Sequence, residues 1–315
     1  MYGVTAQVEA ADEGRYAVCV VPLPVAPDVV WDAVSTGEGI SSWFVPCALE
    51  PEVGGRIVQF ADPGAPDPTT GPEAAAEAML TATVGEITAY DPPTGSVPGT
   101  FTYEERDWMG DQIPVPPWET SCAVVDDGEG GSVLTLRSGF ASAGQLVEQS
   151  VDGSLSGWVQ ALTVLAHRLT HRPADGVVTV DAATDPVDST VPELWSRVSA
   201  RLIAPAAGAG GSPGDGTAVV ARSGEVGGIV AFTSEASVTL ILSAPVDGIL
   251  ELFAFPAGDT HEDAAGRAAL AVRAFEYVDV PGGDASPLGA AAVDGVEPSW
   301  DAPRWRAWLD HLATD

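Results

Sequence analysis

The sequence contains no lysine, so all 13 of its basic residues are arginines. This absence excludes several reaction mechanisms. A P-loop places a lysine on the nucleotide phosphates, and pyridoxal phosphate enzymes and Schiff-base aldolases both form an imine with a lysine. The chain therefore belongs to none of these enzyme classes.

Cysteine is also scarce, and its spacing fits no metal or disulfide framework. Cys19, Cys47 and Cys122 are odd in number and form no C-x-x-C pair. A disulfide-stabilised scaffold or a structural zinc site needs more cysteines at closer spacing. We predict reduced thiols in the core, no bound metal and no other cofactor.

Long apolar runs and a basic leader are missing as well. No stretch approaches the roughly 18 apolar residues of a membrane span, and the N-terminus has no basic segment followed by an apolar one. The sequence predicts a soluble, cytoplasmic protein without a membrane span.

Positive charge is rare beside the acidic residues. There are 45 acidic and 13 basic residues, which gives a formal net charge of -32 at pH 7. Such a chain repels polyanions and gains nothing from counterion release at phosphates, so nucleic acid is excluded as a partner. The charge is expected to keep the protein soluble, and a basic partner protein is the alternative.

The length of 315 residues and the 45% hydrophobic content are sufficient for two domains. The first begins with an apolar strand over residues 15–23, then a helix from Pro27 and a second short helix through Ser42. Several strand-like pieces follow, and leucine and tryptophan then recur at helical spacing over residues 152–172. This order predicts an α+β domain over residues 1–174, with helices on one face of a curved antiparallel sheet.

One segment of the first half has no clear pattern. Residues 61–78 are rich in proline, glycine and alanine and lie between two predicted strands. We predict a surface insertion, and a lid is the alternative.

The second half, residues 175–315, repeats the same plan in weaker form. Trp195 follows Trp31 by 164 positions, and each lies in a predicted helix directly after the first strand of its half. Residues 204–216 are rich in alanine and glycine where the first half has its second short helix. These features predict a duplicated domain with a degenerate second copy and a flexible loop at residues 204–216.

Six ordered pieces of the first half are typical of one superfamily. They are VPLPVAPDVVWDAVS, WFVP, EPEVGGRIVQF, GEITAYDPPTGSVPGTFTYE, SVLTLRSGF and DGSLSGWVQALTVLAHRL. The chain from Arg15 to Arg172 resembles the START-like, helix-grip superfamily, also called SRPBCC, in the branch similar to the activator of the heat-shock-chaperone ATPase. The resemblance implies a curved antiparallel sheet that grips a long C-terminal helix, with an apolar cavity between them.

The resemblance also implies a range of functions. Members of the superfamily bind hydrophobic small molecules, some act as cyclases or hydrolases, and others bind a chaperone. We expect the first domain to bind a hydrophobic small molecule without catalysis. A cyclase-like or hydrolase-like enzyme that uses the same cavity is one alternative, and an interaction protein that binds a chaperone through its surface is the other.

The candidate ligand-binding residues are mostly aromatic, since aromatic walls with few polar groups suit an apolar ligand. They are Trp43, Phe44, Phe60, Phe101, Trp118, Arg137, Trp158 and Leu162. For each aromatic residue, core filling is the alternative. Strand alternation can direct Arg56 or Arg137 inward to a ligand carboxylate, or outward to one of the many acidic residues.

The sequence assigns no catalytic residue. Glu104 and Glu105 supply an acid–base carboxylate if one of them points into the cavity, and otherwise lie at a solvated strand end. His167 and His171 are one helical turn apart, but no third metal ligand accompanies them. Their position beside Arg168 and Arg172 favours a role at the negative end of the helix dipole.

Overall fold

In the computed structural model, two compact units are described, one covering residues 2–176 and the other residues 177–278 and 297–314. The structure describes residues 2–11, 14–63, 65, 68, 71–95, 97–106, 108, 116–141, 145–202, 218–220, 226–257, 266–278 and 297–314. None of the helices in these ranges combines the length and apolarity that crossing a bilayer requires.

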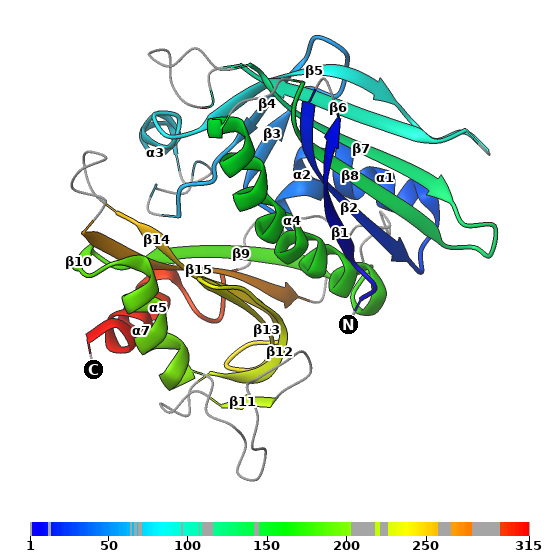
Figure 1. The fold of residues 1–315 in the computed structure, drawn as a ribbon. Coiled ribbons are helices and arrows are strands. Elements are labelled where there is room, and N and C mark those ends of the chain that lie inside the picture. Colours follow the sequence, from blue (N-terminus) through cyan, green and yellow to red (C-terminus); the bar gives the residue numbers. More distant parts are fainter. Residues whose placement is uncertain are drawn as a thin grey trace. The chain divides into compact units, whose positions relative to one another are not determined.

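The first unit is built on one antiparallel sheet, in the spatial order β1-β2-β8-β7-β6-β5-β4-β3. Its strands are β1 (Thr5–Ala11), β2 (Gly14–Leu23), β3 (Cys47–Leu49), β4 (Arg56–Gln59), β5 (Thr83–Asp91), β6 (Gly99–Glu105), β7 (Trp118–Asp126) and β8 (Ser132–Phe140). The helix α4 (Gln145–His171) packs on β1, β2 and β8. In Figure 1 this helix runs across the concave face of the curved sheet. The predicted helix-grip arrangement is confirmed.

Two helices follow β2, as predicted. In α1 (Pro27–Ser35), Pro27 occupies the first turn, where its missing N–H costs no hydrogen bond, and Val30, Trp31 and Val34 are buried. Thr36 then ends α1 and caps α2 (Gly37–Ser41), because its Oγ1 accepts a hydrogen bond from the Gly39 N–H at 3.0 Å. The chain leaves α2 directly into Trp43 and Phe44, which places both aromatic rings beside the sheet–helix interior.

Three elements differ from the predictions. The edge strand β1 precedes the apolar run that was expected to open the domain. The helix α4 begins at Gln145, about two turns before the predicted start at residue 152. The insertion at residues 61–78 contains the helix α3 (Pro72–Ala78), because an alanine-rich stretch that begins with Pro72 and Glu73 favours a helix even without an apolar face.

The second unit follows the same order of elements. They are β9 (Gly176–Ala183), β10 (Val187–Asp188), α5 (Val191–Leu202), β11 (Ala218–Val220), β12 (Gly227–Thr233), β13 (Ser237–Ala244), β14 (Gly248–Pro256), β15 (Arg267–Val278) and α7 (Ala302–Thr314). In the first unit the strand before α1, β2, pairs with the last strand, β8; in the second unit β9 and β10, which precede α5, both pair with the last strand, β15, and a helix closes each unit. The second copy is thus a shorter form of the first. The predicted loop at residues 204–216 lies outside the described residues.

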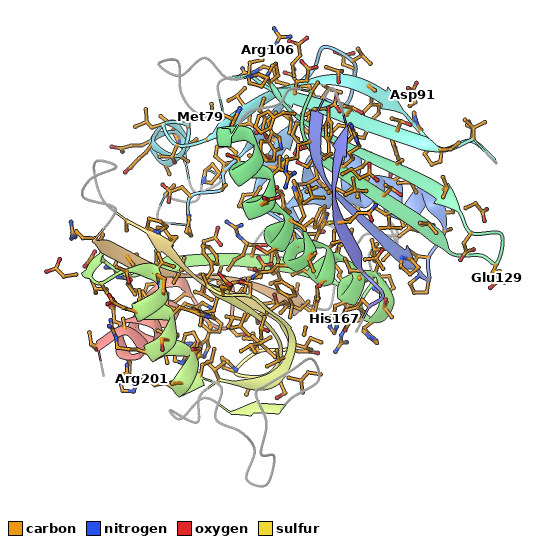
Figure 2. The ribbon with its side chains drawn as sticks, in the orientation of Figure 1. Met79, Asp91, Arg106, Glu129, His167 and Arg201 are labelled. Atoms are coloured by element: carbon orange, nitrogen blue, oxygen red, sulfur yellow. The ribbon has the colours of Figure 1, made fainter. Side chains whose placement is uncertain are left out.

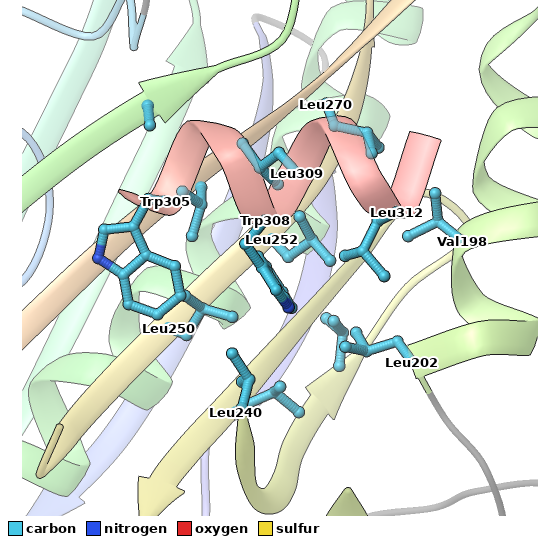
Figure 3. Close-up of a cluster of buried hydrophobic side chains, with 14 of the residues drawn as sticks. Val198, Leu202, Leu240, Leu250, Leu252, Leu270, Trp305, Trp308, Leu309 and Leu312 are labelled. Carbon is cyan, nitrogen blue, oxygen red and sulfur yellow. The ribbon is translucent and has the colours of Figure 1, made fainter. Parts of the chain in front are cut away.

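A dense apolar core lies between α5, α7 and the sheet of the second unit. Trp305 and Trp308 of α7 pack among leucine and valine side chains from α5 and from three strands, as Figure 3 shows. Trp195 of α5 is 7% exposed, and Trp31 of α1 is 6% exposed. Each tryptophan therefore anchors the first helix of its unit to the core beneath it.

Candidate functional site

An aromatic cluster lies between α4 and the concave face of the first unit's sheet. Trp118 of β7 and Phe140 of β8 meet edge to face with ring centroids 4.6 Å apart, and Trp108 contacts both rings at 5.4 and 5.0 Å. Trp158 of α4 packs against the same small core, together with Leu155 of the same helix. We call Phe44, Trp108, Trp118, Phe140 and Trp158 the aromatic cluster.

Phe44 joins this cluster through the helix. Its ring stacks on Trp158 with centroids 5.0 Å apart, and on the other side it stacks on Trp43 at 5.6 Å. Trp43 itself is buried, and its indole N–H donates to the carbonyl of Ala33 at 2.9 Å. Trp43 is therefore a fixed core residue, whereas Phe44 and Trp158 retain partial exposure.

A belt of hydrogen-bonded polar side chains crosses the same face of the sheet. The Trp118 indole N–H donates to Ser138 Oγ at 2.7 Å, and the hydroxyls of Ser138 and Thr120 are hydrogen-bonded at 2.8 Å. Gln59 Nε2 donates to the Tyr103 hydroxyl at 3.0 Å. Thr120 also hydrogen-bonds Tyr103, so the polar belt (Gln59, Tyr103, Thr120, Ser138 and Trp118) is continuous from β4 to β8.

The polar belt depends on a glycine in the strand that it crosses. Tyr103 lies on β6 and Gln59 on β4, and β5 runs between them. A Cβ on Gly85 of β5 would stand 3.2 Å from the Tyr103 ring and 2.9 Å from the Ile57 side chain. Only glycine leaves room for the Tyr103 ring to pass over β5 to Gln59.

Replacing Gly85 by alanine is expected to lower the free energy of unfolding of the first unit by about 1–3 kcal/mol, the usual cost of overpacking. The displaced Tyr103 ring would also lose its hydrogen bond to Gln59. Urea unfolding measures the loss. Gly54→Ala is unsuitable as a control because Gly54 has a positive φ, whereas Gly153→Ala adds a methyl group in open space on α4 and should raise stability slightly, since alanine is the better helix former. An unchanged or increased stability of Gly85→Ala would contradict the prediction.

Glu105 lies beside the polar belt on the inner face of β6. It follows the alternation of the buried residues Phe101 and Tyr103, and it stands directly opposite Trp118 in the β6–β7 register. Glu104, on the outer face, pairs in register with Glu86 and Glu119. Burial raises the pKa of the Glu105 carboxyl to about 7. The structure therefore places one of the two glutamates considered from the sequence on the inner face.

The charge of Glu105 affects the titration of Tyr103. Burial holds the pKa of Tyr103 well above its usual value, the nearby Glu105 raises it further, and the hydrogen bonds from Gln59 and Thr120 oppose these effects. Figure 2 shows Arg106, which follows Glu105, at the opposite end of the sheet from Asp91 and Glu129. The Arg106 guanidinium lies 3.4 Å from the Glu86 carboxylate, so Arg106 forms its ion pair with Glu86 and not with Glu105.

The predicted ligand-binding residues fall into three groups. Phe44, Trp118 and Trp158 belong to the aromatic cluster, with Trp43 stacked behind Phe44 and Leu162 fully buried on the same helix. Phe101 is 1% exposed and packs with Tyr90 and Tyr103, on the part of the face where Tyr90 meets Trp31 of α1. The assignment of these residues to a ligand stays a prediction.

In the described part of the chain, Phe60 and Arg137 make no ring contact with the aromatic cluster. Phe60 directly follows β4, and its N–H donates to the carbonyl of Pro46. Arg137 lies between the buried Leu136 and Ser138, on the outer face of β8. It pairs with Glu119 at 3.2 Å and stands over the ring of Tyr16. Its side chain therefore points outward to an acidic residue, which is the second of the two orientations that the sequence allowed. Arg56 is likewise exposed on the outer face of β4.

The basic end of α4 is more buried than its position at a helix terminus predicted. Arg168 is fully buried, and its guanidinium donates to Ser42 Oγ at the end of α2. His167 contacts the Tyr2 hydroxyl through Nδ1, at the end of α4 that Figure 2 labels. Burial and then the neighbouring His171 and Arg172 lower the pKa of His167 to about 4. Arg168 thus joins α4 to the turn that carries Trp43 and Phe44.

Metal-ligating side chains do not converge in the described ranges. No group of three or more histidine, cysteine, aspartate or glutamate side chains is placed there to share a metal ion. Cys19 and Cys122 are buried free thiols, and Cys47 is half-buried.

Comparisons with known proteins give only distant structural similarity. No protein-family model matches the chain, and no curated protein matches its sequence. Among solved structures, CalU16 from Micromonospora echinospora is 17% identical over 54% of this chain and 87% of its own, with a TM-score of 0.35. DynU16, a protein of the dynemicin biosynthetic locus, is 18% identical over 84% of this chain and 87% of its own, with a TM-score of 0.36.

A third similar structure is the di-domain ARO/CYC protein BexL from the BE-7585A biosynthetic pathway. It is 12% identical over 84% of this chain and 85% of its own, with a TM-score of 0.38. The helix-grip fold described above rests on the chain's own sheet order and helix placement. The branch similar to the chaperone-ATPase activator, and a chaperone partner, stay predictions.

Several residues of the site were not selected from the sequence. For four of these residues, no individual prediction was made, because each lies in a strand or loop that was predicted only as a whole. They are Phe140, Trp108, Tyr103 and Thr120. Strand alternation was the available signal for Ser138, since it shares its face with the buried Leu134 and Leu136. Trp108 had no such signal, because it lies outside any strand.

Proposed function

We propose that the first unit binds a hydrophobic small molecule between α4 and the concave face of its sheet. The observation that carries the proposal is the partial exposure of the aromatic cluster. Phe44, Trp118 and Trp158 retain accessible surface although their rings contact inward-facing neighbours. Large aromatic surfaces beside a few fixed polar groups are typical of ligand sites.

The polar belt supports the same proposal. Its five side chains satisfy one another across four strands, so the belt is fixed before any ligand binds. A rigid polar edge beside an apolar wall orients a ligand without a large cost in side-chain entropy. Phe44, which is held between Trp43 and Trp158, forms the wall on the side of α2.

A neutral fluorescent probe, N-phenyl-1-naphthylamine, tests this proposal. Trp158→Leu removes the ring that stacks on Phe44, and we expect it to weaken probe binding about tenfold, as burial of roughly one aromatic side chain contributes 1.5–3 kcal/mol. Binding is measured by the rise in probe fluorescence. Native mass spectrometry of the protein purified without added ligand then shows whether a small molecule is retained.

The matched control is Leu80→Ala, since Leu80 is 83% exposed in the first unit and lies apart from the aromatic cluster. A probe that binds to exposed apolar surface would respond to Leu80→Ala and not to Trp158→Leu. That result, or the absence of any probe binding, would refute the proposal.

A second candidate function is proton transfer to or from the bound molecule. Glu105 favours it, because this carboxyl has a pKa of about 7 and stands beside Trp118 of the aromatic cluster. A group that titrates near neutral pH is suited to act as a general acid or base. This candidate corresponds to the cyclase-like or hydrolase-like alternative, and turnover that Glu105→Gln abolishes would establish it.

A further inference from the structure

Glu105 differs from the other polar side chains of the inner face. Trp118, Ser138, Thr120, Tyr103 and Gln59 all satisfy one another within the polar belt. For the Glu105 carboxyl, the described residues provide neither a hydrogen-bond partner nor an ion pair. Glu105 is only partly buried, so a ligand packed on the aromatic cluster would displace water from the carboxyl and would have to supply a hydrogen-bond partner in its place.

The surroundings of Glu105 favour its neutral form. The titratable side chains that face it from the packed strands are Tyr103 on β6 and Cys122 on β7, and burial raises the pKa of each. Both are therefore neutral near pH 7. The inward residues of β5, Gly85 and Ile87, carry no charge, and α4 presents Leu155 and Trp158 to this space. Burial alone accounts for the raised pKa of Glu105.

We propose that the neutral carboxyl of Glu105 donates a hydrogen bond to an acceptor oxygen, such as a ketone, on the apolar molecule bound at the aromatic cluster. This inference rests on the proposed function. It adds the chemical class of the ligand and a dependence of ligand affinity on the protonation of Glu105. A carboxylic acid in an apolar site is an effective donor as long as it stays protonated. The affinity for a neutral, carbonyl-bearing ligand then falls as pH rises and Glu105 loses its proton.

The distribution of cations favours a neutral ligand over a carboxylate. Arg137, which the sequence offered as a partner for a ligand carboxylate, is paired with Glu119 on the other face of the sheet. Arg168 is hydrogen-bonded to Ser42, at the end of α2. An anionic ligand would also be repelled by the net charge of -32.

Two naphthalene probes test the proposal. The first is 6-propionyl-2-(dimethylamino)naphthalene, which carries a ketone, and the second is 2-(dimethylamino)naphthalene, which has the same ring system without it. Dissociation constants are measured by fluorescence at pH 6 and pH 8.5. We expect the ketone probe to bind at least about tenfold more weakly at pH 8.5, since each pH unit above the pKa lowers the protonated fraction about tenfold. The ketone-free probe is expected to bind equally at both values.

Two variants separate Glu105 from its neighbours. Glu105→Gln keeps an N–H donor and cannot ionise, so its affinity for the ketone probe should be the same at both pH values. Glu104→Gln, on the outer face of the same strand, should preserve the wild-type pH dependence. Circular dichroism confirms that each variant is folded.

The outcomes distinguish the two proposals. If both probes bind with no pH dependence, or if Glu105→Gln retains the dependence, the role of Glu105 is refuted while the binding site stands. If neither probe binds to the wild-type protein at pH 6, the proposed function is refuted, and the role of Glu105 with it.

Discussion

Replacing Arg273 by alanine is expected to lower the free energy of unfolding of the second unit by about 3–5 kcal/mol, the cost of breaking a buried ion pair from one side. Arg273 of β15 is 5% exposed, and its Nε and Nη2 donate to the two carboxylate oxygens of Asp181 at 2.8 and 2.9 Å. In the variant, the Asp181 carboxylate stays largely buried and has lost the cation that neutralised it. Urea unfolding measures the loss.

The buried pair belongs to a polar row across four strands. Thr239, Glu251 and Arg273 stand opposite one another in the register of β13, β14 and β15, and Asp181 lies on β9, which pairs with β15. Glu251 is 8% exposed, and burial raises its pKa to about 7 although the nearby Arg273 opposes this shift. Without Arg273, the row would keep two carboxyl groups and no cation.

Two comparisons isolate the cause of the loss. Arg267 lies on the same strand, and its partner Asp188 is 3.8 Å away and almost fully exposed, so Arg267→Ala should change stability by only about 0.5 kcal/mol. The double variant Arg273→Met with Asp181→Leu replaces the pair by apolar groups and should regain much of the stability. A similar loss in Arg267→Ala and Arg273→Ala would contradict this account.

Sequence periodicity was sufficient to predict the framework of the first unit. The apolar run at residues 15–23, the proline-initiated helix and the leucine spacing after residue 152 each follow from local physical preferences, and the structure contains β2, α1 and α4 there. The strand β1 was missed because residues 5–10 are mostly exposed and contain only one large apolar residue, Val8, so pairing with β2 and packing against α4 determine their conformation. The helix α3 was missed for a different reason. Its residues have high intrinsic helix propensity but form no apolar stripe that would reveal the helix in the sequence.

The candidate site was less predictable because it depends on contacts between distant residues. Aromatic side chains are easy to find in a sequence, but their grouping is not. Phe101 and Trp118 lie on neighbouring strands of one face, yet Phe101 packs toward Tyr90 and Trp118 toward Phe140. The irregular register of β5 between Ile87 and Ala89 contributes to this, because it turns Tyr90 onto the inner face beside Phe101. No sequence pattern marks that irregularity.

Strand alternation did decide the orientation of single residues once the register was known. Glu104 and Glu105 are indistinguishable by type, and only the position of β6 relative to Phe101 and Tyr103 directs Glu105 inward. The same logic directs Arg137 outward, since Leu136 and Ser138 face the core. A shift of one residue in either strand would have exchanged these roles.

The two units are expected to respond to pH in different ways. In the second unit, Glu251 has a pKa of about 7 when folded and about 4.5 when unfolded. The folded state therefore binds more protons between these values, and the resulting stability is present below pH 4.5 and lost as pH rises through 7. At about 1.4 kcal/mol per pKa unit, the loss reaches at most about 3 kcal/mol.

In the first unit, two groups act in opposite directions. Glu105 contributes stability that is lost as pH rises through about 7, with a reduced magnitude because its side chain is only partly buried. His167, whose pKa falls to about 4, contributes stability that is present above pH 6.5 and lost as pH falls through 4. Between pH 5 and 7 these contributions largely cancel, so the first unit should show a nearly flat profile.

The cysteines allow the two profiles to be measured in one chain. All three cysteines lie in the first unit, so the exposure of thiols in urea follows that unit, and circular dichroism follows both. The unfolding transition of the second unit is the one that appears in circular dichroism without exposing thiols. We expect the midpoint of this transition to move to lower urea concentration between pH 5 and pH 7.5. Glu251→Gln should remove this shift, whereas His167→Phe should leave it and make the thiol-exposing transition fall with rising pH. A shift of the second unit that persists in Glu251→Gln would show that another group binds the proton, because a glutamine at this position cannot titrate.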